Sequence, residues 1–386
     1  MASEEALRER AVSLYLQGTR KASIAHTLGR SREWVYKWIS RYKSGQEKWN
    51  ESKSHAPIYR PNKTSPSVVE QVIKARKFLE DSPHLESGAY FIWHYLTNNG
   101  ISPPSVSTIN RILRDHGLTS KKVRYKKSGI EYPEIPTNTQ IMDLIGPRYI
   151  RGGERYYLFT IISNDTRHAG VYPILSKSGE DITKSLLNFW KEYSIPDFLQ
   201  MDNELSFKGS NRHPRGLGTV LRTVMSLNVS PVFIPVGEPW RNGVIERFNQ
   251  KVEKTLLMQN HRDFNELRLH SKEFTNTHNS SHPYSTLGFK TPLQLDKELD
   301  VPIEPLLDDY IFNKRPPLDS SKSNEIHFIR LVRSDLIINV LNTDVKVNPR
   351  LMHTYVDACL SINENCLLIR QDNKTVQSFE FIMPLV

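Results

Sequence analysis

The 386-residue sequence is poor in cysteine and contains no long hydrophobic run. Its two cysteines, Cys359 and Cys366, are too few for a disulfide framework or a four-thiolate zinc site. The thirteen histidines show no metal-ligand spacing with them, so we do not expect a zinc knuckle. No stretch approaches the ~18 apolar residues of a membrane span, and residues 1–10 lack the apolar segment of a signal peptide. These absences predict a reduced, intracellular protein without membrane contact.

The sequence also lacks the pattern G-x-x-x-x-G-K-[S/T], which excludes a P-loop nucleotide site. What it does have is positive charge, and that charge is unevenly distributed. The net charge is +10 for the whole chain, but +12 for residues 1–127 and −2 for the other 259 residues. A basic front end attached to a nearly neutral body predicts binding to a polyanion. The hydrophobic content of 38% is sufficient for packed cores.

Three short helices are predicted within the first 48 residues. The first spans 4–17, the second includes 24–28, and the third begins after Ser31 as N-cap and ends at Gly45. A tight turn before the last of three helices is typical of a helix-turn-helix unit. Val35, Trp38 and Ile39 would face its core. The exposed positions of the third helix are predicted to contact DNA: Ser31, Arg32, Tyr36, Lys37 and Arg41.

A second helical unit is predicted over residues 62–120, with helices at 67–79, 89–98 and 105–116. Prolines stand at the start of the last helix and Gly117 stands past its end. This unit is interpreted as a second helix-turn-helix or winged-helix-like domain. Its predicted DNA contacts, continued into the basic linker 121–136, are Ser107, Asn110, Arg111, Arg114, Lys121, Lys122 and Arg124.

Strand patterns begin near residue 137. Strands are predicted at 139–146, 155–163, 168–175, 197–202 and 229–236, with helices at 180–193 and 217–227 and a long helix from Trp240 to about 262. This order predicts an α/β core with a mixed sheet over 137–300. Short, closely spaced strands over 320–386 predict a small C-terminal β-barrel. The fold class is therefore multidomain, with all-α units at residues 1–48 and 62–120 preceding the core and barrel.

Three carboxylates stand where chemistry is expected. Asp143 interrupts an apolar strand, where a charge is costly unless it is paired, bound to a metal or exposed at a cleft. Asp202 ends a strand, at the edge where open α/β sheets bind ligands. Glu246 lies on the long helix, sharing a face with Asn242, Asn249 and Glu253. Three such oxygen donors could hold two Mg²⁺ or Mn²⁺ ions for phosphoryl transfer.

These residues resemble a known family. Asp143, the pair Asp-Asn at 202–203, the string NGVIERFN at 242–249 and the string HPYSTLGFKTP at 282–292 resemble the integrase-core DDE transposases of bacterial insertion sequences, which are related to retroviral integrases. The resemblance implies an RNase H-like core in which Asp143, Asp202 and Glu246 are catalytic and hold two Mg²⁺. It also implies that Asn203, Asn242 and Arg247 contact these ligands or the DNA backbone.

The same resemblance implies the function and the partners. The function would be DNA transposition, by metal-dependent cleavage and strand transfer at the ends of a mobile element. The partners would be element-end DNA, target DNA and further copies of the chain, as a dimer or higher oligomer on paired ends. The location would be the bacterial cytoplasm, in association with the nucleoid.

Some alternatives stay open at this level. Asp165 could replace Asp143, although Asn-Asp-Thr is chiefly a turn pattern. Glu204 stands where the family more often has glycine, and 43 residues separate Asp202 from Glu246, more than is usual in the family. Glu238 and Glu253 are interpreted as solvated or capping residues. The rival functions are a non-catalytic DNA-binding regulator and a nuclease without joining activity.

Overall fold

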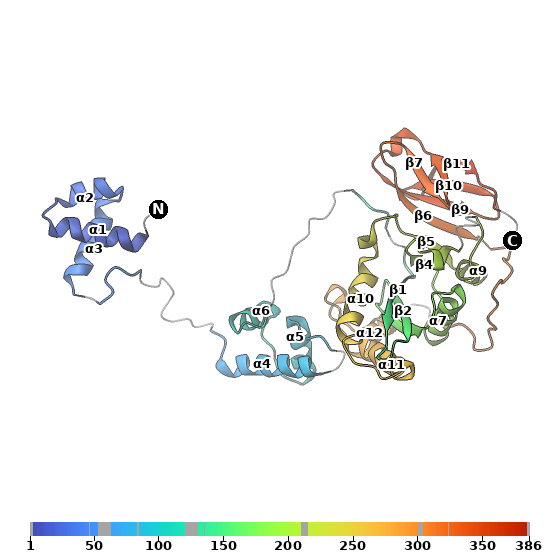
Figure 1. The fold of residues 1–386 in the computed structure, drawn as a ribbon, viewed down its shortest axis with the longest axis horizontal. Helices are drawn as coiled ribbons and strands as arrows, with labels where there is room; N and C mark the ends of the chain where they lie inside the picture. Colours follow the sequence, from blue (N-terminus) through green and yellow to red (C-terminus); the bar gives the residue numbers. More distant parts are fainter. Residues whose placement is uncertain are drawn as a thin grey trace. The chain divides into compact units, whose positions relative to one another are not determined.

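The computed structural model describes residues 3–45, 47–52, 63–82, 85–119, 130–134, 136–209, 215–299, 304–322 and 324–383. The chain divides into two compact units, Met1–Thr64 and Ser65–Val386. Figure 1 shows their helices and strands. No helix among the described residues is both long and apolar enough to cross a membrane.

The first unit contains three helices, α1 (Glu4–Leu16), α2 (Lys21–Leu28) and α3 (Arg32–Lys43). Ser31 caps α3 by accepting a hydrogen bond from the backbone N–H of Trp34. The apolar faces meet in a small core that includes Ala11, Ile24, Val35 and Ile39. The predicted helices and the predicted inward face of α3 are confirmed.

The second unit begins with three further helices, α4 (Pro66–Asp81), α5 (Ala89–Asn98) and α6 (Val106–Asp115). Ser65 and Ser105 cap α4 and α6. Val72, Ile92 and Ile109 are fully buried in the core that the three helices share. The described residues 63–82 and 85–119 contain no strand that could form a wing.

The sheet that follows has the strand order of an RNase H-like fold. Its strands β1 (Thr139–Tyr149), β2 (Arg155–Ser163), β3 (Ala169–Ile174), β4 (Phe198–Met201) and β5 (Ser230–Phe233) lie in the order β3-β2-β1-β4-β5. β2 is antiparallel to its two neighbours, while β1, β4 and β5 are parallel. The carboxyl ends of β1 and β4 therefore meet at one edge. The predicted mixed α/β core is confirmed.

Helices cover both faces of this sheet. On one face, α7 (Gly179–Glu192), α8 (Leu205–Lys208) and α9 (Thr219–Ser226) share a core with Phe159 and Met201. On the other, α10 (Gly243–Thr255) and α11 (Phe264–Ser281) pack against Ile141 and Leu158 through Phe248 and Phe274. Short turns η1 (Pro239–Asn242) and η2 (Ser285–Leu287) and helix α12 (Pro292–Glu298) complete this region.

The long helix predicted for residues 240–262 is wrong at both ends. Its first residues form the 3-10 turn η1, and α10 itself ends at Thr255. The backbone N–H groups of Leu256 and Leu257 both bond to the Val252 carbonyl, which closes the last turn. Asp263 then caps the separate helix α11. As a result, Glu246 lies in the first turn of α10, where the helix dipole favours a negative charge.

The strands after residue 320 are a second departure from the sequence-based expectation. β6 (Glu325–Leu331) pairs in parallel with β5, and β9 (Tyr355–Ser361), β10 (Cys366–Gln371) and β11 (Lys374–Glu380) continue outward as one sheet of nine strands. A separate ribbon contains β7 (Ile337–Val340) and β8 (Thr343–Lys346), followed by η3 (Pro349–Leu351). The described strands form no closed sheet, so the predicted barrel is not seen.

The reason for this departure is a shared core. The ring of Phe328 on β6 stacks on Phe233 of β5 at a centroid distance of 5.1 Å. Val356 and Leu360 are buried in the same cluster as Met201. The C-terminal strands bury their apolar side chains in this shared core. Their alternation of apolar and polar residues therefore does not require a closed barrel.

Candidate active site

The fold brings the three predicted carboxylates to one edge of the sheet. Asp143 is on β1, and Asp202 directly follows β4. The parallel pairing aligns Ile141 with Gln200, and continuing that register by two residues aligns Asp143 with Asp202 on the same face. α10 lies over this face and carries Glu246. Asp143 and Glu246 line one pocket of about 620 Å³ together with Asn249.

The charges at this edge repel one another. Burial, followed by the nearby carboxylates of Asp202, Glu204 and Glu246, raises the pKa of Asp143 to about 7 against the opposing hydrogen bond from the Leu144 N–H. Burial also raises the pKa values of Asp202 and Glu246. Among the described residues, no lysine, arginine or histidine forms an ion pair with any of the three. A bound cation would relieve this repulsion.

Two asparagines of the NGVIERFN string hold the carboxylates in place. Asn249 donates a hydrogen bond from Nδ2 to Oδ2 of Asp143 at 2.8 Å. Asn242 is buried and accepts a hydrogen bond from Nε2 of Gln200 at 2.7 Å. The first contact orients a candidate ligand, and the second ties the start of α10 to β4. Both bonds position Glu246 relative to the two aspartates.

The other two residues predicted beside the ligands behave differently. Asn203 donates to the carbonyl of Ile234 at 2.7 Å and accepts from the guanidinium of Arg330 at 3.1 Å, so it joins the end of β4 to β5 and β6. Arg247 is exposed on α10, and its charge adds to burial in lowering the pKa of Arg167. The structure therefore places Asn203 as a structural link and Arg247 on the outer side of the helix.

Each alternative carboxylate has another partner. Asp165 accepts a hydrogen bond from the Asn138 N–H at 2.7 Å, which fits its turn pattern. Glu204 pairs with Lys177, and Glu253 pairs with Arg148 at 2.5 Å. Glu238 accepts from Tyr355 and Arg241.

Two lysines near the site could not be assigned to it from the sequence. Lys177 and Lys208 lower the pKa of Asp202 through their positive charge, although burial outweighs them. Lys177 follows β3 and lies 25 residues before Asp202 in the chain. Only the sheet order, which brings the ends of these segments together, places it there.

Most of the predicted DNA-contacting residues are on helix surfaces. Tyr36 is exposed on α3 with the Lys21 ammonium 4.1 Å from its ring, whereas the Ser31 hydroxyl is used as a cap. Arg41 is half-buried, stacks on Trp38 and donates to the Glu51 carbonyl. The residues with exposed side chains also include Arg32, Lys37, Ser107, Asn110, Arg111 and Arg114. Lys121, Lys122 and Arg124 lie outside the described residues.

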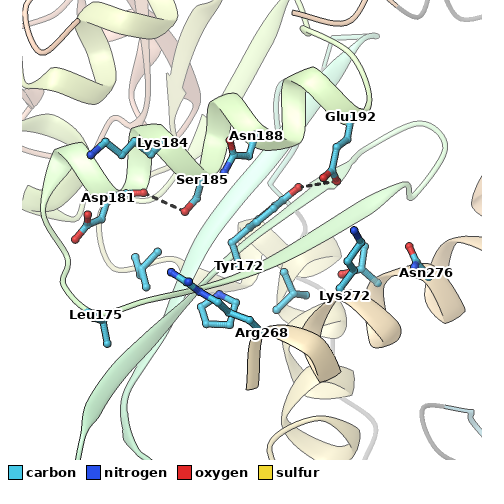
Figure 2. Close-up of a pocket in the computed structure, with 14 residues that line it drawn as sticks. Tyr172, Leu175, Asp181, Lys184, Ser185, Asn188, Glu192, Arg268, Lys272 and Asn276 are labelled. Atoms are coloured by element: carbon cyan, nitrogen blue, oxygen red, sulfur yellow. Dashed lines mark hydrogen bonds between the residues drawn. The ribbon is translucent and has the colours of Figure 1, made fainter. Parts of the chain in front are cut away.

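A second pocket, of about 610 Å³, lies between α7, β3 and α11 (Figure 2). Arg268 and Lys272 of α11 lie beside it, the Lys184 ammonium pairs with Glu180, and Tyr172 donates a hydrogen bond to Glu192 at 3.3 Å. Its described lining includes none of the three carboxylates. The pocket with metal-ligand chemistry is therefore the one at Asp143 and Glu246.

Comparison with protein families gives two matches. Residues 227–292 match the family described as integrase core domain, a range that includes Glu246 and the HPYSTLGFKTP string. The match supports an integrase-like superfamily. Residues 6–59 match the family described as putative ATPase subunit of terminase (gpP-like). That range begins within α1 and includes α2 and α3, and the sequence has no P-loop pattern. The two matches suggest a function of the DNA-recombination or transposase type.

Several solved integrases show limited likeness to the chain. The catalytic core of HTLV-2 integrase, solved in complex with magnesium, is 14% identical, with a TM-score of 0.33, 42% of this chain covered and 97% of that chain. The catalytic core of BIV integrase is 12% identical, with a TM-score of 0.33 and coverages of 43% and 97%. A simian T-cell lymphotropic virus intasome, solved with PP2A regulatory subunit B56 gamma, is 16% identical, with a TM-score of 0.37 and coverages of 81% and 97%.

Proposed function

We propose that the protein is a DNA transposase that binds the ends of a mobile element and catalyses metal-dependent cleavage and strand transfer. The observation that carries this proposal is the convergence of Asp143, Asp202 and Glu246 at one sheet edge, where none of them has an ion-pair partner in the described part of the chain. The integrase core domain match over residues 227–292 supports the same reaction class.

The residues present fit divalent cations. Asp143, Asp202 and Glu246 offer only carboxylate oxygens, the donors that Mg²⁺ and Mn²⁺ prefer. Burial and then the neighbouring carboxylates raise the pKa of Asp143, and a bound cation would offset both effects. Two ions bound there would activate the attacking oxygen and stabilise the leaving oxygen of a phosphodiester. Asn249 holds Asp143 in one orientation, and Asn242 fixes the start of α10, so Glu246 faces the aspartates before substrate arrives.

The helical units supply the proposed DNA recognition. The start of a recognition helix contacts base edges in the major groove of helix-turn-helix complexes. α3 presents Arg32, Tyr36 and Lys37 to solvent, and α6 presents Asn110 and Arg111. Guanidinium and amide groups form bidentate hydrogen bonds with guanine and adenine. We assign sequence-specific contacts to these residues and phosphate contacts to Lys121, Lys122 and Arg124.

The decisive experiment incubates the protein with a labelled element end, a target plasmid and Mg²⁺. A transposase produces strand-transfer products that depend on the terminal sequence. The regulator alternative would bind the end without cutting it, and the nuclease alternative would cut without joining. Either of those two results, with a correctly folded protein and an intact element end, would overturn the proposal.

Concerted joining also requires assembly. An element has two ends, and one set of three carboxylates provides one strand-transfer centre, so at least two protomers are needed. Two-fold assemblies match the inverted symmetry of paired ends. We propose a dimer or higher oligomer on paired ends, with end recognition partly in trans. Light scattering of the complex tests this: a fully active complex containing one protomer would contradict it.

A further inference from the structure

A second group of metal-ligand side chains lies on the C-terminal strands. β6 and β9 are antiparallel, and their register places His327 directly opposite Cys359. Glu325 is two residues from His327, so its side chain is on the same face of the sheet. One ligand atom from each of these three residues lies within 4.8 Å of the other two.

The imidazole of His327 is oriented for coordination. Its Nδ1 is 2.9 Å from Oδ2 of Asp357. Its Nε2 has no hydrogen-bond partner among the described residues, although the side chain is nine-tenths buried. Metal-binding histidines commonly use one ring nitrogen for a carboxylate in this way, which leaves the lone pair of the other nitrogen for the ion. The free Nε2 is 3.8 Å from Oε2 of Glu325, too far for a hydrogen bond.

The other two donors are also held in position. Arg370 on β10 donates to Oε1 of Glu325 at 3.1 Å, which leaves Oε2 directed toward His327. Cys359 is fully buried, and burial together with the charges of Asp357 and Glu325 raises the pKa of its thiol. The buried thiol of Cys359, the imidazole Nε2 of His327 and the carboxylate of Glu325, which hydrogen-bonds to that thiol, thus face a common point, with Arg370 and Asp357 outside them.

We propose that Glu325, His327 and Cys359 form a zinc site that cross-links β6 to β9. The nitrogen, sulfur and oxygen donors suit Zn²⁺, whereas Mg²⁺ prefers oxygen donors alone. Tetrahedral coordination with bonds of ~2.0–2.3 Å requires ligand separations of about 3.5 Å, and the 3.8 Å between Nε2 and Oε2 is close to this value. Binding forms a Zn–S bond, breaks the S–H bond of Cys359 and releases the proton to solvent; water takes the fourth position.

This site is separate from the proposed catalytic edge. Its ligands come from β6 and β9, and none of them lines the pocket of Asp143 and Glu246. A metal at β6 and β9 would stabilise the outer strands of the sheet, because it joins Cys359 to His327 and Glu325, which precede it by 32 and 34 positions in the chain.

The test uses the full chain carrying Asp143→Asn, so that the catalytic edge contributes little to metal binding. After treatment with chelator, Co²⁺ is titrated and the near-ultraviolet thiolate-to-cobalt charge-transfer band is recorded. We expect the band to saturate at one Co²⁺ per chain and to disappear on addition of Zn²⁺. Zn²⁺ alone should raise the melting temperature. The band reports sulfur ligation, which the oxygen-only edge cannot produce.

Variants then locate the sulfur and the nitrogen. Cys359→Ser should abolish the band, and the matched control Cys366→Ser should keep it, because Cys366 lies outside the cluster. Asp357→Asn should weaken Co²⁺ binding by ~10–100-fold through loss of the histidine orientation. If circular dichroism shows that Cys359→Ser does not fold, His327→Gln replaces it and should weaken binding at least as much as Asp357→Asn.

Two results would overturn the proposal: a folded chain that shows no thiolate band, or a band that is lost in Cys366→Ser and kept in Cys359→Ser. Strand-transfer assays on the wild-type chain are scored independently. A thiolate band without joining activity would support the zinc site and contradict the transposase proposal. Joining activity without a thiolate band would support the transposase proposal and contradict the zinc site.

Discussion

Charged side chains are arranged in opposite ways in the helical units and at the carboxylate edge of the sheet. In the first unit, cations are at the surface and rest on aromatic rings, as with Lys21 over Tyr36 and Arg41 over Trp38. At the sheet edge, Asp143 is largely buried beside other acids and its pKa rises to about 7. Exposed cations cost little and attract DNA from a distance, whereas gathered acids are unfavourable until a cation binds. In the proposed transposase, this difference would separate the surface that binds DNA from the site that cleaves it.

The largest expected effect tests the catalytic side of this comparison. Asp202→Asn should reduce strand transfer by ~10³-fold or more, because one oxygen ligand of the proposed two-ion site is lost. Binding to the element end should stay close to wild type, since the helical units are unchanged. Gel-shift and strand-transfer assays on the same preparation measure both. Glu253→Gln is the matched control, because Glu253 pairs with Arg148 and should be dispensable.

The next effect tests the binding side. Arg32→Ala combined with Lys37→Ala should weaken binding to the element end by at least ~10-fold and reduce its salt dependence, because two exposed cations of α3 are removed. Glu33→Gln, on the same exposed helix surface, is the control and should not weaken binding. Unchanged affinity in the double variant would show that α3 is not a DNA-contacting helix.

Arg111→Ala tests α6 in the same way. We expect the variant to bind mutated element ends nearly as well as the correct one, with a loss of discrimination of ~1–3 kcal/mol at one base pair. Competition binding with single-base variants of the end measures this. Discrimination equal to wild type at every position would contradict the assignment of Arg111 to base recognition.

A smaller effect tests whether the hydrogen bond from Asn249 to Asp143 influences the pH dependence of the joining rate. Asn249→Ala removes the hydrogen bond to Asp143 and should lower the joining rate by roughly fivefold. Loss of a donor to the carboxylate favours its protonated form, so the rate should reach half its maximum at a higher pH than in wild type. Gln250→Ala, the exposed neighbour, should leave the pH profile unchanged. A lower rate without a shifted profile would indicate a structural role only.

The smallest effect concerns stability. Folding raises the pKa of the Asp143 carboxyl to about 7. Its protonation therefore stabilises the fold fully at pH values below the pKa of the unfolded chain, and this stabilisation is lost as the pH rises through about 7. In the metal-free protein at pH 8, Asp143→Asn should therefore increase the free energy of unfolding by ~1–2 kcal/mol, and the gain should vanish near pH 4. Urea unfolding at the two pH values measures it. A gain that is equal at both would contradict the repulsion described here.

Local patterns in the sequence were sufficient for most of the elements. The Ser31 cap and Gly45 predicted α3, and the prolines and Gly117 predicted α6, within one or two residues, because these signals act on the nearest backbone groups. The same reasoning failed for α10, where residues 256–262 have helical composition but are drawn into a turn before the cap at Asp263. It also failed for the barrel, because alternation along a strand does not say which strand lies beside it.

The candidate site divides in the same way. The sequence by itself determined which residues are the candidates for chemistry: Asp143 in an apolar strand, Asp202 at a strand end and the NGVIERFN string. Tertiary structure decided that Asn249 holds Asp143, that Lys177 lies near Asp202, and that His327 stands opposite Cys359. Hydrogen-bond and capping signals act over a few residues and can be found in the chain itself. Strand order and register join residues far apart in the chain, so only the folded sheet brings these pairs together.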